Sequence, residues 1–256
     1  MGDQDGVSVQ ATATTVAIIE ELRDRDRAGV TELATALDLS KSAVHNHLST
    51  LVSLGYVRRA DGAYGLTHQF LRLGLGIRER SAVYRAAKSD LRTLAQTTGE
   101  TVNLVVPEAD HGVYLYRVGD GDHPIPEGGQ VALHASAAGK SILAFRDHEA
   151  VDAFVDDHGL PALTERTVTD PATLRSQLRS IRDQRVAFDR GEQTPDWQCV
   201  ASPIVVDGDP IGAISVSGPA DRMQGKRLEE DATGLVVSTA KAIELELLDS
   251  AASETE

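Results

Sequence analysis

Hydrophobic residues recur at helical spacing three times within the first 54 residues of the chain. This period predicts three helices, which begin near Thr12, at Thr31 and at Lys41. Threonine and serine favour the N-cap position, so we expect Thr31 and Ser40 to cap the second and third helices. In the third helix Val44, Leu48 and Leu51 fall at one-turn intervals, which predicts that they form its buried side.

Extended segments replace the helical period after Gly55. Two short runs, 56–59 and 63–66, flank Asp61-Gly62, a dipeptide that favours a tight hairpin turn. Three helices followed by a two-stranded hairpin is the element order of a winged helix-turn-helix domain. We place this domain at residues 9–68.

The polar side of the third helix carries Lys, Ser, His and Asn in place of the Glu and Lys mixture of an ordinary solvated surface. Such side chains hydrogen-bond to base edges when a helix enters the major groove, and arginines at a hairpin suit phosphate or minor-groove contacts. The predicted DNA-binding residues are Ser40, Lys41, Ser42, His45, Asn46, Ser49, Arg58 and Arg59. The alternative is the polar face that any amphipathic helix has.

Charge is distributed unevenly along the chain. Residues 1–80 hold ten acidic and nine basic side chains, whereas residues 81–256 hold twenty-nine acidic and sixteen basic ones. A polyanion-binding module attached to an acidic domain has this distribution. The acidic excess and the small number of lysines also suit a high-salt cytoplasm, so we expect a halophilic source. An ordinary acidic bacterial protein is the alternative.

The segment after the hairpin is densely apolar between residues 70 and 77, with Gly74 and Gly76 as interruptions. A glycine inside a helix costs about 1 kcal/mol relative to alanine. We therefore expect a linker helix at residues 69–82 that breaks, or meets another helix closely, at these glycines. It is either a dimer seam or a plain linker.

From residue 83 onward, helical and extended segments alternate. Extended segments come in pairs separated by turns, around residues 101–119 and 197–219. Helical segments are predicted near residues 147–158, 170–184 and 224–249. Hairpin-linked strands with flanking helices indicate an α+β domain with an antiparallel sheet, which we place at residues 83–252.

Two stretches of this second domain suit ligand binding. Residues 135–139, Ala-Ser-Ala-Ala-Gly, precede a predicted helix, whose free N–H groups and dipole favour a carboxylate or a phosphate. Close packing of the helix against the sheet is equally consistent with these small residues. Ser215 and Ser217 share one face of a strand, where they either line a small-molecule pocket or face solvent.

The sequence shows little sign of a catalytic site or a metal site. Gly-Lys-Ser at residues 139–141 lacks the glycine that a phosphate-binding loop needs five residues earlier, where His134 stands. Cys199 is the only cysteine, which excludes an intramolecular disulfide, and no histidine near it in the sequence could activate it as a nucleophile. The eight histidines lack metal-binding spacing. We expect neither an enzyme nor a metal cofactor.

The chain also lacks the sequence signals of membranes and export. No apolar run approaches the ~18 residues of a transmembrane helix, and the first ten residues are acidic and polar. We expect a cytoplasmic protein without membrane contact.

Several motifs together resemble the IclR family of transcription regulators, over about residues 10–250. LSKSAVHNHLSTLVSLGYVRR, at 39–59, is similar to the recognition helix and wing of the family. TGETVNLVV at 98–106, LHASAAGKSILA at 133–144 and FDRGEQTPDWQCVASPIVVDGDPIGAISVSGP at 188–219 are similar to its effector domain. With the acidic composition, the resemblance suggests a haloarchaeal member.

The resemblance implies a GAF-like effector domain, assembly as a dimer or a dimer of dimers, and binding to palindromic operators. It also implies a pocket for a small, carboxylate-bearing metabolite, held by loop amides and two serines. Residue by residue, the implied pocket positions are Ala137, Ala138, Asp189, Cys199, Ser215 and Ser217. This chain departs from the family at Arg190 and Trp197, which could change the shape or charge of the pocket.

Two other functions compete with this interpretation. An enzyme would use Cys199 or Asp189, but the sequence offers no evident base and no cofactor motif. A sensor could use its helix-turn-helix to contact proteins, but the near-neutral N-terminal third argues against this.

Overall fold

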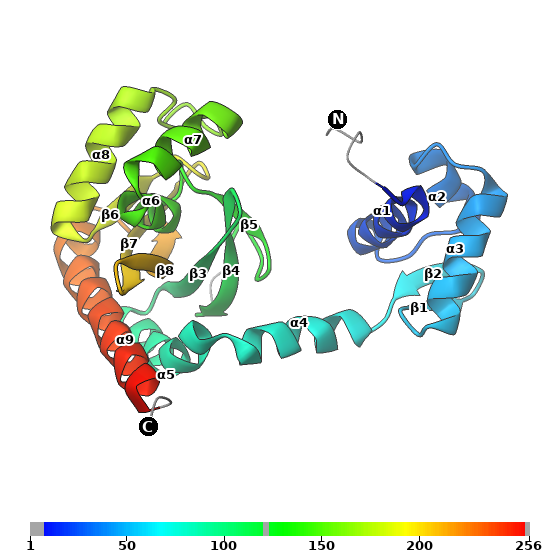
Figure 1. The fold of residues 1–256 in the computed structure, drawn as a ribbon, viewed down its shortest axis with the longest axis horizontal. Helices are drawn as coiled ribbons and strands as arrows, with labels where there is room; N and C mark the ends of the chain where they lie inside the picture. The colour runs from blue at the N-terminus through cyan, green and yellow to red at the C-terminus, as the bar shows by residue number, and fades with distance from the viewer. Residues whose placement is uncertain (1–7, 120–122, 254–256) are drawn as a thin grey trace. The chain divides into compact units, whose positions relative to one another are not determined.

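The computed structural model describes residues 8–119 and 123–253 and divides the chain into two compact units (Figure 1). Along the sequence, the boundary falls between Ile77 and Arg78. Each unit has a hydrophobic core of its own. In the described residues, no helix combines the length and the apolar character that crossing a bilayer requires.

The N-terminal unit has the predicted order of three helices and a hairpin. Its elements are α1 (Gln10–Arg25), α2 (Val30–Ala36), α3 (Lys41–Ser53), β1 (Val57–Ala60) and β2 (Ala63–Leu66). Ser40 caps α3, because its Oγ accepts a hydrogen bond from the Ala43 N–H at 3.1 Å. Thr31 does not cap α2, since the helix begins one residue earlier. The Glu32 carboxylate accepts a hydrogen bond from the Gly29 N–H at 2.7 Å instead.

The core of this unit lies between the helices and the hairpin. Val44, Leu48 and Leu51 are buried, which confirms the predicted inner side of α3. The hairpin pairs Val57 with Leu66 and Ala60 with Ala63. Its turn residues Asp61 and Gly62 have φ angles of 53° and 81°, the left-handed values that favour Asp-Gly in tight hairpins.

Two helices follow the hairpin, α4 (Gln69–Arg80) and α5 (Ala82–Thr98). The expected break at Gly74 and Gly76 is wrong, because α4 is continuous through both. A Cβ added at Gly74 would have no neighbour within 4 Å, so within the described chain this glycine marks no close helix contact. The Leu and Arg residues around the glycines favour the helix and offset their cost.

The larger unit is built on one antiparallel sheet with the strand order β5-β4-β3-β8-β7-β6. Its strands are β3 (Thr101–Glu108), β4 (His111–Val118), β5 (Gln130–Ala132), β6 (Ala187–Arg190), β7 (Trp197–Val206) and β8 (Asp209–Pro219). Its further helices are α6 (Ala137–Phe145), α7 (His148–His158), α8 (Pro171–Gln184), a π-helical turn (Arg227–Ala232) and α9 (Thr233–Ser253). The predicted α+β class is confirmed.

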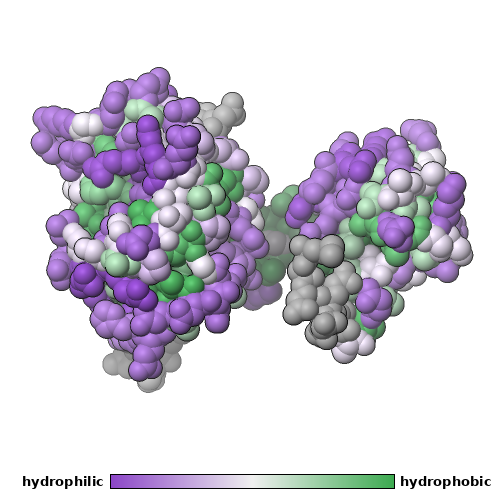
Figure 2. Space-filling view, turned by 90° about the horizontal axis from the view of Figure 1, so that it is seen from above, coloured by the Kyte–Doolittle hydropathy of each residue, from purple (hydrophilic) through white to green (hydrophobic). Residues whose placement is uncertain are grey.

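Helices cover both faces of this sheet, as Figure 1 shows. Residues of α5 and α9 form one hydrophobic core with the first face. Residues of α6, α7 and α8 form a second core with the opposite face, which we call the α6 face. Hydrophilic residues cover most of the larger unit on the side seen in Figure 2, as the acidic composition predicts.

A bulge in β4 gives the α6 face an extra aromatic side chain. The register pairs Leu104 with Tyr116 but Val105 with Tyr114, so β4 holds one residue more than β3 at this point. Tyr114 and Tyr116 therefore lie on opposite faces, although they are two residues apart. Tyr114 joins the α6 face.

Candidate DNA-binding and effector sites

The polar side of α3 lies outside the core of the N-terminal unit. Its five predicted DNA-binding positions are all exposed: Lys41, Ser42, His45, Asn46 and Ser49. On the opposite side, Val44 and Leu48 are fully buried. A helix held in this way presents its N-terminal polar residues to solvent, as a helix that enters the major groove must.

Two polar residues of this region also serve the fold. The Ser40 hydroxyl oxygen is occupied by the cap of α3, although its O–H can still donate to a phosphate. His47 is half-buried, and its Nδ1 lies 2.8 Å from the Thr15 Oγ1 of α1. His47 therefore connects α1 to α3, whereas His45, two residues earlier, is exposed.

The hairpin carries the two predicted arginines on β1. Arg58 and Arg59 are both exposed. Arg59 lies opposite Tyr64 on β2, and its guanidinium carbon is 5.6 Å from the centroid of the Tyr64 ring. This stacking orients Arg59 along the hairpin surface, where a guanidinium can reach a phosphate.

In the larger unit, the sheet register brings most of the predicted effector residues together on the α6 face. Ser217 on β8 lies opposite Cys199 on β7, and Cys199 lies opposite Asp189 on β6. Ser215 occupies the next position on the same face of β8. All four side chains are buried, and the two serines are each 1% exposed. Ser215 and Ser217 thus face the interior and not solvent.

Asn103, which is not among the residues predicted from the sequence, completes this polar row. Its Nδ2 donates to the Ser215 Oγ at 3.3 Å and to the Ser217 Oγ at 3.1 Å. Its Oδ1 accepts a hydrogen bond from the Arg117 Nε at 2.7 Å. The signal available in the sequence was one amide in the otherwise apolar run Val-Asn-Leu-Val-Val.

Asp189 and Cys199 lie in an environment that disfavours negative charge. Burial raises the pKa of Asp189 to about 6, although its Oδ1 accepts a hydrogen bond from the Glu192 N–H at 2.7 Å. Burial also raises the pKa of the Cys199 thiol, and the nearby Asp189 charge raises it further. A buried thiol with a raised pKa is a poor nucleophile, so Cys199 is a neutral group of the α6 face.

The small-residue loop places the first turn of α6 against this face. Ser136 caps α6 by accepting a hydrogen bond from the Gly139 N–H at 3.0 Å. Ala137 and Ala138, the first two residues of the helix, are buried in the same core as Cys199. Gly139 permits close packing, because an added Cβ would lie 2.5 Å from the Leu133 Cα. The N–H groups of the two alanines precede the intrahelical hydrogen bonds and can serve an anion.

A buried ion pair lies next to the Asp189 side of the pocket. The Lys140 Nζ is 2.5 Å from the Glu192 Oε1, and Lys140 is only 2% exposed. The second carboxylate oxygen of Glu192, Oε2, is buried, and no hydrogen-bond partner for it occurs among the described residues. Beside the effect of burial, the Glu192 charge raises the pKa of Asp189, whereas the Lys140 charge lowers it.

Aromatic rings and Arg117 form the other end of the α6 face. The His123 ring lies between Tyr114 and Trp197, with centroid distances of 5.1 and 5.2 Å. Burial lowers the pKa of His123 to about 4, so this imidazole is neutral near pH 7. The Arg117 guanidinium carbon is 4.8 Å from the Tyr114 centroid. Edge-to-face rings beside a guanidinium suit a planar ligand with a negative charge.

A winged helix with an exposed polar recognition face, joined to a domain with a buried row of polar side chains, is the arrangement of a DNA-binding regulator with an effector domain. Two family models match the chain: the IclR helix-turn-helix domain over residues 12–61, and the bacterial transcriptional regulator IclR C-terminal domain over residues 77–245. The chain therefore belongs to the IclR family of transcriptional regulators. It is a DNA-binding transcription regulator with a C-terminal effector domain, and not an enzyme.

Characterised relatives share most of the chain. The HTH-type transcriptional regulator BhcR of Paracoccus denitrificans is 33% identical over 89% of this chain and 84% of its own length. The probable HTH-type transcriptional regulator ArcR of Halobacterium salinarum is 28% identical over 93% of this chain and 94% of its own length. An IclR homolog from Microbacterium hydrocarbonoxydans, crystallised in complex with 4-hydroxybenzoate, has the same fold. Its TM-score is 0.80 at 24% identity, over 93% of this chain and 99% of that one.

Proposed function

We propose that this chain regulates transcription in response to a small carboxylate-bearing metabolite bound on the α6 face. The observation that carries this proposal is the buried row of Ser217, Cys199 and Asp189 beside the first turn of α6. A few polar side chains among apolar ones are typical of a small-molecule site.

The ligand carboxylate would bind at the α6 end of the site. The N–H groups of Ala137 and Ala138 supply donors there, and the helix dipole favours a negative charge. The Ser217 hydroxyl, which donates to the Thr101 carbonyl oxygen at 3.4 Å, would turn to the ligand instead. The carboxyl groups of Asp189 and Glu192 repel an anion from the other side. The Microbacterium homolog, whose ligand is an aromatic carboxylate, supports this class of effector. The ring cluster of Tyr114, His123 and Trp197 fits such a ligand.

DNA binding is assigned to α3 and the wing. The residues proposed to contact the operator are Ser40, Lys41, Ser42, His45, Asn46, Ser49, Arg58 and Arg59, which are all exposed. Residues 9–68 form the DNA-binding domain, 69–82 the linker and 83–252 the effector domain in this proposal. Effector binding would favour one arrangement of the effector domain, and the linker would convert it into a changed spacing of two recognition helices.

Two copies of the chain would bind a palindromic operator, as a dimer or a dimer of dimers. The apolar side chains of α4 support this assembly. Leu71, Leu73, Leu75 and Ile77 are between 39% and 62% exposed. Exposed apolar side chains along one helix favour burial against a partner. We further propose a cytoplasmic protein of haloarchaeal type, for which the acidic composition and the Halobacterium relative are the support.

DNA binding and effector binding are tested in turn on the same set of proteins. Gel shifts with the DNA upstream of the gene measure operator binding by the unmodified chain and by Asn46→Ala, with Ser53→Ala at the far end of α3 as the control. Loss of a bidentate base contact costs about 1–3 kcal/mol, so Asn46→Ala should weaken binding roughly 5- to 150-fold. The control should bind normally.

Effector binding is followed separately through Trp197, the only tryptophan of the chain. Titration with a panel of small carboxylates, 4-hydroxybenzoate among them, should change its emission for at least one compound. That compound should then alter the gel shift, and Ser217→Ala should weaken its binding but not operator binding. A normal gel shift from Asn46→Ala would contradict the assignment of α3. An effector response that Ser217→Ala leaves intact would contradict the assignment of the pocket.

A further inference from the structure

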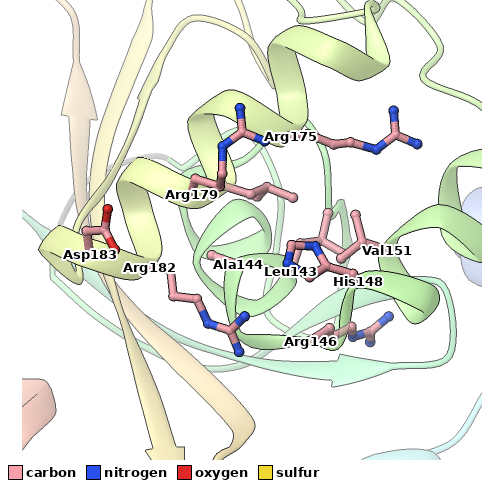
Figure 3. A pocket seen from close by; sticks show the side chains of 10 residues that line it. Leu143, Ala144, Arg146, His148, Val151, Arg175, Arg179, Arg182 and Asp183 are labelled. Atoms are coloured by element: carbon pink, nitrogen blue, oxygen red, sulfur yellow. The ribbon is translucent and has the colours of Figure 1, made fainter.

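A hollow in the larger unit lies at the C-terminal end of α6, between α7 and α8 (Figure 3). Its volume is about 170 Å³. Buried side chains of Leu143, Val151 and Leu178 contribute an apolar floor. Four arginines also line this hollow, namely Arg146, Arg175, Arg179 and Arg182. Such a concentration of guanidinium groups is unexpected in a chain with a net charge of −14.

The arginines line the hollow from two elements. Arg175, Arg179 and Arg182 are spaced by four and three residues, so they share one side of α8. Arg182 reaches from α8 toward the end of α6, and its guanidinium carbon is 5.7 Å from the centroid of the Phe145 ring (Figure 3). Arg146 follows the last residue of α6.

Most of this positive charge is not neutralised within the protein. Arg175 pairs with Asp152 of α7, with 2.7 Å between Nη2 and Oδ1. In the described part of the chain, no carboxylate lies within ion-pair distance of Arg146, Arg179 or Arg182. Asp183 also lines the hollow but pairs with none of them. Like charges one helical turn apart repel each other, so the arrangement of α8 costs stability unless an anion offsets it.

We infer that this hollow binds a small organic anion that carries two or more negative charges and an apolar body. Guanidinium groups bind carboxylates and phosphates through paired hydrogen bonds. Arg146 Nη2 donates to the Ala109 carbonyl oxygen at 3.3 Å, which leaves its charge without a carboxylate. A single carboxylate would occupy one of the three guanidiniums that lack an ion pair, whereas a phosphate monoester or a dicarboxylate can engage two. The apolar floor formed by Leu143, Val151 and Leu178 favours a ligand with a hydrocarbon part.

This site is distinct from the proposed effector pocket. The effector pocket uses Ala137 and Ala138 at the first turn of α6, whereas the hollow uses Leu143 and Ala144 at its last turn. The two sites also differ in charge, because the effector pocket contains the carboxyl groups of Asp189 and Glu192. The second site can therefore be tested independently of the first.

The test is calorimetric titration of the full chain with phenyl phosphate and with phthalate, two dianions that have an aromatic body. Benzoate, a monoanion, and inorganic phosphate, which has no apolar body, are the comparison ligands. We expect one dianion to bind per chain with a Kd below about 1 mM, and the comparison ligands to bind at least tenfold more weakly. The tighter of the two dianions identifies phosphate or dicarboxylate as the natural charge pattern.

Substitutions then locate the site. Arg179→Gln combined with Arg182→Gln should weaken the binding at least tenfold. Both side chains are exposed, so the fold should be retained, which far-UV circular dichroism checks. Arg23→Gln on α1 removes an exposed arginine from the other unit, and it should leave the affinity unchanged. Undiminished binding by the double variant, or no binding of either dianion, would overturn the inference. Trp197 emission, which reports the effector site, should respond to the dianions equally in the unmodified chain and in the double variant.

Discussion

Asp189 on β6 lies directly opposite Cys199 on β7, so a carboxyl group and a thiol share the buried α6 face of the sheet. Burial raises the pKa of both groups, and that of Asp189 reaches about 6. The thiol therefore stays protonated at neutral pH. Asp189 changes its charge in a pH range that is easily reached in solution, which makes it the titrating group of the pocket.

Asp189 should make the effector domain less stable as pH rises. Its pKa is about 6 in the folded protein against an ordinary value of 3.8, so the folded state binds the proton more tightly. The contribution of this group to stability is therefore full below pH ~4 and is lost as pH rises through about 6. The loss amounts to roughly 2–3 kcal/mol.

The measurement compares the unmodified chain with Asp189→Asn, in which the amide oxygen can still accept the Glu192 N–H. Urea unfolding is followed by Trp197 emission at pH 4.5 and pH 7.5. Carboxyl groups with lowered pKa values, such as Asp170, have the opposite effect, because their contribution to stability is lost as pH falls. They are the same in both proteins, so the informative quantity is the difference in unfolding free energy between the two proteins. From pH 4.5 to pH 7.5, the unfolding free energy of the variant should rise relative to that of the unmodified chain. An unchanged difference would show that Asp189 ionises normally.

Cys199 should resist alkylation in the folded protein. The thiolate is the reactive form, and burial both raises the thiol pKa and restricts access. Iodoacetamide at pH 7.5 should label the native chain at least tenfold more slowly than the same chain in concentrated urea. Intact-mass spectrometry measures the single modification directly, because the chain has no other cysteine. Rapid labelling of the native chain would mean that the pocket opens to solvent far more often than its burial indicates.

Local signals in the sequence predicted much of the fold. The cap at Ser40, the Asp-Gly turn of the wing and the paired strands of the larger unit depend on residues close together in the chain. The expected break at Gly74 failed because the glycine penalty is small beside the preference of a whole helix. The bulge that separates Tyr114 from Tyr116 could not be foreseen, since it depends on pairing with β3.

The candidate pocket was only partly visible in the sequence. Alternation showed that Ser215 and Ser217 share a face, but the face that meets α6 is decided by packing. The role of Asn103 could not be predicted, because its partners lie 112 and 114 residues away along the chain. The buried pair of Lys140 and Glu192 likewise joins segments that have no common motif. The spacing of the arginines on α8 can be read from the sequence, but only the structure shows that they line a hollow.

Ser40 and Ser42 should have separable effects, although both are exposed serines near the start of α3. Ser40→Ala removes the acceptor of the Ala43 N–H, and loss of such a cap costs about 1 kcal/mol. Hydrogen exchange at the first amides of α3 should then accelerate about fivefold. Ser42→Ala should leave exchange unchanged and weaken only operator binding. Equal exchange rates in both variants would show that the cap contributes nothing to the stability of α3.

The apolar side chains of α4 should decide the oligomeric state. Leu71 and Leu75 are 58% and 39% exposed and belong to none of the hydrophobic cores of the described residues, so replacing both with glutamate should leave the fold intact. If these side chains are buried between two copies, the Leu71→Glu and Leu75→Glu double variant places unpaired carboxylates in that interface and should be a monomer in sedimentation velocity.

Leu163→Glu is the matched control, because Leu163 is 43% exposed in the larger unit and lies outside α4. It should sediment like the unmodified chain. The monomeric variant should also lose most of its operator affinity, since a palindrome needs two recognition helices held at one spacing. A double variant that remains a dimer with normal operator binding would remove α4 from the interface and assign the assembly to another surface.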